Sequence, residues 1–209
     1  MTTVVVLAKE PVPGRVKTRL HPAFSYLEAA ALAEAALADT LAAVRRAPVE
    51  RRLIALAGRP GCWLPAGFEV VSQVDGGLDR RIAAALAGCE APCLVVGMDT
   101  PQLTPELLDM RWGGADACLG PALDGGYWAI GLRRPTPELA ARLLHGVPMS
   151  TPDTAAAQLT RLHRAGLRVR LLPPLWDVDT VADARVVAAA APRTAFARTL
   201  RRLEGEAPA

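Results

Sequence analysis

The chain has 209 residues, of which 51% are hydrophobic and 22% are charged. That length and apolar fraction suit one domain with a buried core. The 24 basic and 21 acidic residues leave a net charge of only +3, whereas a general nucleic-acid-binding surface needs a denser basic face. We therefore expect no nucleic-acid partner.

Cysteine usage and hydropathy narrow the class further. The four cysteines, Cys62, Cys89, Cys93 and Cys118, form no C-x-x-C pair and the three histidines are scattered, so we expect no zinc site. No apolar run reaches the roughly 18 residues of a membrane span, and the first residues lack the pattern of a signal peptide. We expect a cytoplasmic, soluble protein with reduced thiols and no membrane partner.

Apolar runs and helical patterns alternate along the chain. Ser25 followed by Glu28 has the pattern of a capping box, and Thr104 followed by Pro105 is typical of a helix start. In chain order the patterns predict a strand at 3–8, a helix at 25–46, strands at 52–57 and 69–73, a helix at 79–88, a strand at 93–99, a helix at 104–110, strands at 116–121 and 127–132, a helix at 151–166, a strand at 167–173, a helix at 180–190 and a terminal helix at about 193–205.

This alternation predicts an α/β fold. We expect a three-layer α/β/α sandwich around a mainly parallel, Rossmann-like sheet, with residues 1–209 forming a single domain. In such sheets ligands bind beyond the carboxyl ends of the strands. The segments that follow the strands are therefore the candidates for a functional site.

The first such segment, AKEPVPGRVKTRL, is a stiff basic loop. It carries Lys9, Arg15, Lys17 and Arg19, and Gly14 lets the backbone approach a ligand closely. Cations and free backbone N–H groups at a strand end suit a polyphosphate. The spacing matches neither the Walker loop nor G-x-G-x-x-G. The alternative is an ordinary basic surface loop.

Acidic residues follow two other strands. Asp99 ends a very apolar strand, where a carboxylate needs a cation or hydrogen-bond donors. Asp177 and Asp179 alternate in WDVDT, so both should point to the same side and repel unless a metal joins them. Mg²⁺ or Mn²⁺ would suit such carboxylates. The alternatives are that Asp99 caps a turn and that Asp179 or Thr180 caps the next helix.

A glycine turn lies between the strands at 116–121 and 127–132. The segment GPALDGGYWAIGL places Asp124 before Gly125 and Gly126, with two aromatic residues after them. Glycines permit positive φ and a close approach of the backbone to a ligand. A plain hairpin turn explains the glycines, but it does not explain the acid and the aromatic side chains that flank them.

Together, the segments AKEPVPGRVKTRL, GMDTPQL, GPALDGGYWAIGL and WDVDT resemble the glycosyltransferase-A-like family of small bacterial proteins, which includes glycosyltransferases proposed for arsenosugar biosynthesis. That family is similar in fold to sugar-phosphate and cofactor nucleotidyltransferases such as the phospholactate guanylyltransferases. QVDGGLDRRI at 73–82 and PMST at 148–151 match more loosely, and the resemblance runs from residue 3 to about residue 190. It implies a nucleotide-diphospho-sugar transferase fold of the GT-A type.

The resemblance also implies roles for individual residues. The nucleotide would lie against Ala8, Lys9, Gly14, Arg15, Lys17, Arg19, Gln73, Gly76 and Gly77. The acceptor or sugar pocket would be formed by Asp124, Gly125, Gly126, Tyr127, Ser150 and Thr151. Asp99, Asp177 and Asp179 would hold Mg²⁺ or Mn²⁺. The catalytic groups would be Arg15 and Lys17, which stabilise phosphate charge, and Asp124, the candidate base. Met149 stands where the family usually has tryptophan.

Three functions remain open at this point. The first is a metal-dependent glycosyltransferase that uses a nucleotide-diphosphate sugar and a small-molecule acceptor. The second is a nucleotidyltransferase that joins a nucleoside monophosphate to a phosphorylated small molecule and releases pyrophosphate. The third is a catalytically silent nucleotide-binding regulator, which would be expected to have lost a metal-binding acid or a basic loop residue, yet all of these are present.

Overall fold

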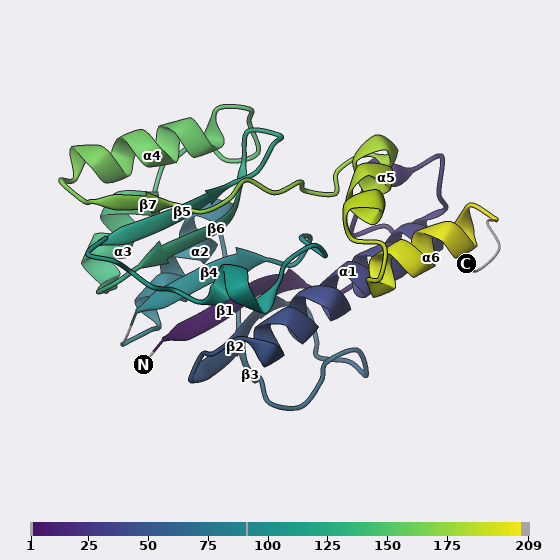
Figure 1. Ribbon diagram of the computed structural model, residues 1–209, viewed down its shortest axis with the longest axis horizontal. Helices are drawn as coiled ribbons and strands as arrows, with labels where there is room; N and C mark the ends of the chain where they lie inside the picture. Colours follow the sequence, from purple (N-terminus) through teal and green to yellow (C-terminus); the bar gives the residue numbers. More distant parts are fainter. Residues whose placement is uncertain (1, 91, 206–209) are drawn as a thin grey trace.

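The computed structural model describes residues 2–90 and 92–205, which form a seven-stranded sheet with helices on both faces (Figure 1). The strand order is β3-β2-β1-β4-β6-β5-β7. The strands are β1 (Thr3–Lys9), β2 (Arg51–Ala57), β3 (Glu69–Ser72), β4 (Cys93–Gly97), β5 (Ala117–Pro121), β6 (Tyr127–Leu132) and β7 (Val169–Leu171). The helices are α1 (Tyr26–Arg46), α2 (Leu78–Ala87), α3 (Pro137–Leu144), α4 (Thr154–Arg164), α5 (Val181–Ala190) and α6 (Ala195–Leu203), with short 3-10 helices η1 (Thr18–Leu20) and η2 (Pro105–Leu108).

Strand direction confirms the predicted, mainly parallel sheet. β1 pairs in parallel with β2 and β4, β2 with β3, and β5 with β7. Within the described sheet only β6 runs the other way, antiparallel to both β4 and β5. The carboxyl ends of β1, β4, β5 and β7 therefore meet at one edge of the sheet, and the start of β6 joins them there.

The alternation of side chains along β1 separates the two faces of the sheet. Val6 packs in the same core as Leu41 of α1, whereas Val5 packs with Leu86 of α2 and Leu143 of α3. Helix α4 adds to the second face through Leu162. The three-layer arrangement predicted from the sequence is confirmed.

Helix α6 packs against α1, and α5 packs against α6, to one side of the sheet (Figure 1). Phe196 and Leu200 of α6 are buried with Leu32 of α1 in a separate apolar cluster. The carboxylate of Asp39 on α1 accepts from the backbone N–H groups of Ala195 and Phe196, at 2.8 Å each, and so satisfies the first turn of α6. No helix in the described ranges is both long and apolar enough to cross a membrane.

The structure differs from the sequence prediction chiefly at three helices. The helix expected at 104–110 is only the short 3-10 helix η2, and α3 was not predicted at all. Both begin with Thr-Pro-Glu. The side chain of Thr136 accepts from the N–H of Leu139 and caps α3, whereas Thr104 makes no such bond. The predicted helix at 151–166 is also shorter, because α4 begins only at Thr154.

Candidate functional site

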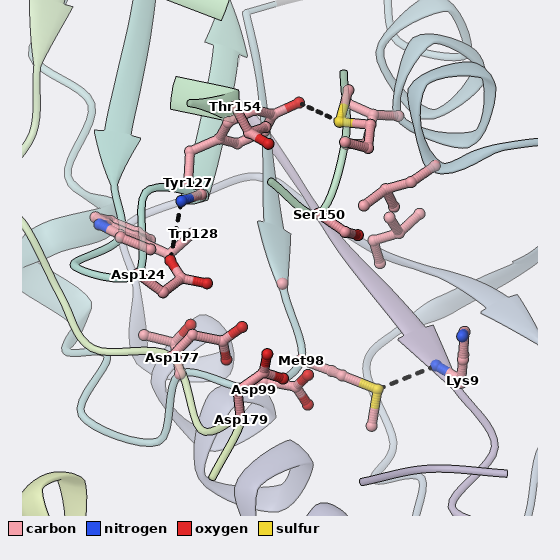
Figure 2. Close-up of a pocket in the computed structure, with 18 of the residues that line it drawn as sticks. Lys9, Met98, Asp99, Asp124, Tyr127, Trp128, Ser150, Thr154, Asp177 and Asp179 are labelled. Carbon is pink, nitrogen blue, oxygen red and sulfur yellow. Dashed lines mark hydrogen bonds between the residues drawn. The ribbon is translucent and has the colours of Figure 1, made fainter. Parts of the chain in front are cut away.

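A cleft of about 670 Å³ opens at the carboxyl edge of the sheet (Figure 2). Its walls come from the ends of β1 and β4, the start of β6, the first turns of α2, and the loops at 15–19, 149–152 and 177–179. The site therefore lies where a doubly wound sheet places its ligands.

Most of the predicted site residues line this cleft, and four glycines do not. The lining residues are Ala8, Lys9, Arg15, Lys17, Arg19, Gln73, Asp99, Asp124, Gly126, Tyr127, Ser150, Thr151, Asp177 and Asp179. Gly14, Gly76, Gly77 and Gly125 are not among the residues that line it. Their roles stay predictions, as do those of the lining residues.

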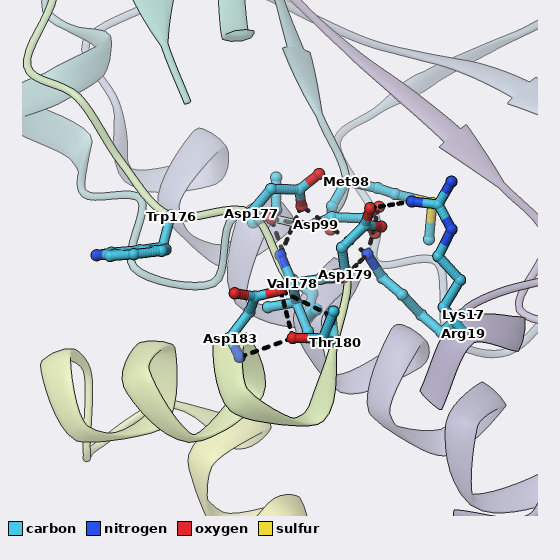
Figure 3. Close-up of polar contacts among 12 residues, drawn as sticks. Lys17, Arg19, Met98, Asp99, Trp176, Asp177, Val178, Asp179, Thr180 and Asp183 are labelled. Carbon is cyan, nitrogen blue, oxygen red and sulfur yellow. Dashed lines mark hydrogen bonds and ion pairs between the residues drawn. The ribbon is translucent and has the colours of Figure 1, made fainter. Parts of the chain in front are cut away.

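The side chain of Lys17 is buried, with 7% of its surface exposed, although it belongs to the basic loop (Figure 3). Its ammonium nitrogen lies 2.8 Å from Oδ2 of Asp99 and 3.9 Å from Oδ1 of Asp177. It also donates to the backbone carbonyl of Val178. Burial opposes the charge, but the neighbouring carboxylates outweigh it and raise the pKa of Lys17. The ammonium group is therefore charged at neutral pH.

Local packing directs Lys17 inward. Val16 before it is buried against α1 with Ala30 and Ala33, and Leu20 after it is buried in the cluster of α1, α5 and α6. Lys17 itself has a left-handed backbone with φ of 48°, and η1 starts at the next residue. Because Val16 and Leu20 fix the chain on both sides of Lys17, its side chain points to the cleft. Arg15, by contrast, is exposed.

Asp99, Asp177 and Asp179, here called the carboxylate cluster, lie together at one end of the cleft (Figure 3). Asp179 pairs with the exposed guanidinium of Arg19. Burial raises the pKa of Asp177 against the opposing charge of Lys17, and together with a smaller contribution from the charge of Asp99 the pKa reaches about 7. These contacts leave the cluster with more negative than positive charge.

The linker after Asp177 also forms a helix cap. The side chain of Thr180 accepts from the N–H of Asp183, whose carboxylate accepts in return from the Thr180 backbone N–H at 2.7 Å. Of the two residues given as alternative caps for this helix, Asp179 and Thr180, the structure shows that Thr180 is the N-cap of α5. Val178 is fully buried, which anchors the two acids on either side of it.

The side-chain oxygens of the carboxylate cluster are of the type that binds hard divalent ions. As they stand, the residues that the structure describes include no group of three His, Cys, Asp or Glu side chains arranged to bind a metal. Asp99 and Asp177 nevertheless converge on one positively charged atom, the ammonium nitrogen of Lys17. Carboxylate oxygens are the ligands that Mg²⁺ and Mn²⁺ prefer. The cluster therefore offers suitable ligands around a position that a cation already holds.

The opposite wall of the cleft combines a carboxylate with apolar side chains. Asp124 is exposed, and its Oδ1 accepts from the N–H of Gly126 at 2.9 Å. The hydroxyl of Tyr127 lies 3.7 Å from the sulfur of Met149, which is a weak acceptor (Figure 2). Burial raises the pKa of Tyr127, so the phenol stays protonated and can donate to a ligand.

Gly125 shapes this wall from outside the cleft. It has φ of +93°, and a Cβ at this position would lie 1.9 Å from the carbonyl oxygen of Pro152. The Gly125 carbonyl also accepts from the N–H of Ala155 at 2.9 Å. Only glycine fits this approach, which holds the loop of Ser150 and Thr151 against the turn after β5.

Trp128 supports the carboxylate cluster indirectly. Its ring lies where a side chain at Gly120 would collide with it, and its indole N–H donates to the carbonyl of Pro173 at 3.0 Å. Trp128 therefore ties β6 to the segment that leads to Asp177.

The segment of Gln73 and Gly76, predicted to lie against the nucleotide, is held by hydrogen bonds to the backbone. Nε2 of Gln73 donates to the carbonyls of Ala8 and Ala55, at 2.8 Å each. Arg81 donates to Oε1 of Gln73 and to the carbonyl of Gly76, and it also lines the cleft. Sequence reasoning missed Arg81 as a site residue. The sequence did contain a signal for it, because Arg81 lies in the first turns of the helix that follows β3.

Solved structures share this architecture. A protein from Desulfovibrio desulfuricans G20, described as a "putative nucleotide-diphospho-sugar transferase", is 26% identical, with 98% of this chain and 95% of that chain covered and a TM-score of 0.85. The manganese complex of Rv0371c from Mycobacterium tuberculosis H37Rv is 22% identical, with 89% and 96% covered and a TM-score of 0.54. A CMP:2-keto-3-deoxy-manno-octonic acid synthetase complexed with CTP is 14% identical, with 90% and 97% covered and a TM-score of 0.52. The chain has the nucleotide-diphospho-sugar transferase fold predicted from its sequence.

The comparison with curated proteins gives no match. Residues 29–151 match the family described as "uncharacterized protein conserved in bacteria" (DUF2064), and the match contains Asp99 and Asp124. Since the matched segment is more than half of the sequence, this chain belongs to the DUF2064 family.

Proposed function

We propose that this protein is a metal-dependent glycosyltransferase that takes its sugar from a nucleotide-diphosphate donor. The observation that carries the proposal is that an exposed carboxylate, Asp124, faces the same cleft as the carboxylate cluster. A hydroxyl acceptor must lose a proton as it attacks the sugar, and a carboxylate within reach can take it. The similarity to a nucleotide-diphospho-sugar transferase supports the same class of donor.

The proposed mechanism assigns one task to each wall of the cleft. A divalent ion held by Asp99, Asp177 and Asp179 would stabilise the charge that develops on the leaving diphosphate. Arg15 is exposed in the basic loop and lines the cleft, so it would pair with the phosphate oxygens. Oδ1 of Asp124 is held by the Gly126 N–H, so its Oδ2 is the atom that would accept the acceptor's proton.

Orientation and electrostatics supply the rest of the rate in this proposal. Leu78, Ile82 and Met149 also line the cleft and would give it an apolar wall for part of the substrate. No covalent enzyme nucleophile is required, because the acceptor itself attacks the sugar carbon and the nucleoside diphosphate leaves.

Nucleotidyl transfer is the second candidate, and the basic loop favours it. Four cations on one loop suit a triphosphate, and a structural relative was solved with CTP. In that reaction a substrate phosphate attacks the α-phosphate and pyrophosphate leaves. The phosphate nucleophile is already anionic and needs no base, so Asp124 would be dispensable.

Ligand screening and Asp124→Asn separate these candidates. We expect nucleotide sugars with Mn²⁺ or Mg²⁺ to raise the melting temperature, and an acceptor to trigger release of nucleoside diphosphate. Asp124→Asn should retain donor binding and lose about 10²–10⁴-fold in turnover. The matched control is Asp153→Asn, an exposed acid beside the cleft that does not line it, which should keep wild-type turnover.

Other outcomes would refute the proposal. Release of pyrophosphate from a nucleoside triphosphate, with full activity in Asp124→Asn, would establish nucleotidyl transfer. Tight nucleotide binding with turnover of neither donor class would identify a silent nucleotide-binding regulator.

A further inference from the structure

We propose that Lys17 competes with the divalent ion for Asp99 and Asp177, so that the metal-free site is closed by the protein's own cation and the ion enters together with the nucleotide. This inference rests on the metal dependence of the proposed function. It concerns a residue of the basic loop whose expected partner was phosphate, but whose partners in the structure are carboxylates.

The ammonium group of Lys17 lies among three protein oxygens in its present position. A lysine ammonium has three N–H donors. The nitrogen lies 2.8 Å from Oδ2 of Asp99 and within 3.9 Å of Oδ1 of Asp177, and it donates to the carbonyl of Val178 (Figure 3). With 7% of the side chain exposed, few of these contacts are shared with water. The ammonium group of Lys17 thus occupies a cation-binding site formed by protein oxygens.

Lys17 and a divalent ion exclude each other from these oxygens. An ion held by Asp99 and Asp177 would lie about 2.0–2.6 Å from their carboxylate oxygens, inside the space of the ammonium nitrogen. Two positive charges that close together repel strongly in a partly buried site. The side chains of Asp99 and Asp177 are 31% and 33% exposed, so the ion can reach them from the cleft once Lys17 leaves.

Lys17 needs another anion before it leaves. A buried ammonium that loses its carboxylates without gaining a partner carries a large desolvation cost. Lys17 also lines the cleft, next to Arg15 and Thr18 of the same loop. Nucleotide phosphates bound there would offer the new partner and free the carboxylates for the ion. Binding of the two ligands is then coupled, and each must raise the affinity of the other by the same factor.

Mn²⁺ binding in the absence of nucleotide tests the competition directly. Free Mn²⁺ would be measured by electron paramagnetic resonance with the full chain, as wild type, Lys17→Met and Lys9→Met. Lys9 and Lys17 are the only lysines in the sequence, and Lys9 is the exposed last residue of β1, just before the loop that carries Lys17. We expect Lys17→Met to bind Mn²⁺ about tenfold or more tightly than wild type, within the usual range of coupling between sites, and Lys9→Met to stay close to wild type.

A second measurement on the wild-type protein avoids any effect of the substitution on folding. An amine-acetylating reagent, followed by mass spectrometry, should label Lys17 much more slowly than Lys9 in the metal-free protein. Saturating Mn²⁺ should speed labelling of Lys17 and leave that of Lys9 unchanged. Adding a nucleoside diphosphate with the Mn²⁺ should protect Lys17 again.

The possible failures are distinct. Equal Mn²⁺ affinity in wild type and Lys17→Met, or Lys17 labelling that saturating Mn²⁺ does not change, would overturn the competition and leave the proposed transferase intact. The absence of Mn²⁺ binding in every protein, with or without nucleotide, would refute the metal dependence itself and this inference with it.

Discussion

Replacing Gly125 by alanine should destabilise the protein more than any other single added methyl group on the cleft loops. The added Cβ would lie 1.9 Å from the carbonyl oxygen of Pro152 and 2.5 Å from its carbonyl carbon. Both are backbone atoms, so no side-chain rotation relieves the contact. The loop of residues 149–152 must therefore move.

The magnitude follows from three contributions. An L-residue with positive φ costs about 1–2 kcal/mol, and overpacking that shifts the backbone costs about 1–3 kcal/mol more. The 2.9 Å hydrogen bond from the N–H of Ala155 to the Gly125 carbonyl is worth about 1 kcal/mol and would be weakened by the movement. We expect Gly125→Ala to lower the free energy of unfolding by about 3–5 kcal/mol, against about 5–15 kcal/mol for a typical domain.

Gly146→Ala is the matched control. Gly146 has φ of +73°, and a Cβ there would meet nothing within 4 Å, so only the backbone cost of about 1–2 kcal/mol applies. Urea denaturation of the two variants and the wild type measures both values. A difference of less than about 1 kcal/mol between the variants would show that Pro152 does not press on Gly125, and the account of this wall would be wrong.

Three further predictions concern the cleft. Because the pKa of Asp177 is raised to about 7, its carboxyl is protonated at lower pH and a metal ion must displace that proton. Mn²⁺ affinity, measured by electron paramagnetic resonance, should therefore fall by up to about tenfold per pH unit below pH 7. Asp177→Asn should remove this pH dependence. Tyr127→Phe removes a hydroxyl that donates to the Met149 sulfur, a weak acceptor, at 3.7 Å. The free energy of unfolding should change by less than about 1 kcal/mol while KM for the acceptor rises, and an unchanged KM would remove the phenol from the pocket. Trp128→Phe loses the 3.0 Å hydrogen bond to the Pro173 carbonyl and leaves a void. Urea denaturation should show that the free energy of unfolding falls by about 2–3 kcal/mol, and a fall of less than about 1 kcal/mol would contradict this structural role.

Short sequence patterns predicted helix starts well where both interacting residues lie within one turn of each other in the chain. The Ser25–Glu28 pair forms the capping box expected at the start of α1, because both partners lie within one turn. The Thr-Pro-Glu signal is less decisive, since it starts an α-helix at Thr136 and only a 3-10 turn at Thr104. The two segments differ in their later residues. Residues 137–144 are uninterrupted good helix formers after the proline, whereas the Thr104 segment soon reaches Gly113 and Gly114 with positive φ.

The location of the site was accessible from the sequence, but its electrostatics were not. Asp99 and Asp177 follow strands, and the carboxyl ends of parallel strands meet at one edge, so topology alone brings the acids together. The burial of Lys17 depends on Val16 packing against α1 and on a carbonyl about 160 residues later in the chain. No local pattern carries that information, and the charge of Lys17 was therefore assigned to phosphate alone.

The contacts between the basic loop and the 177–179 segment also set an order of assembly. Lys17 and Arg19 reach partners 161 and 160 positions further along the sequence, whereas β1 pairs with β2 and β4 much earlier in the chain. Closing so long a loop costs entropy that the sheet must already offset. During synthesis the ribosome adds Asp177 only after all seven strands have been made. The sheet can therefore form around a Lys17 that has Asp99 nearby but still lacks Asp177 and the Val178 carbonyl, and the carboxylate cluster closes as one of the last events of folding.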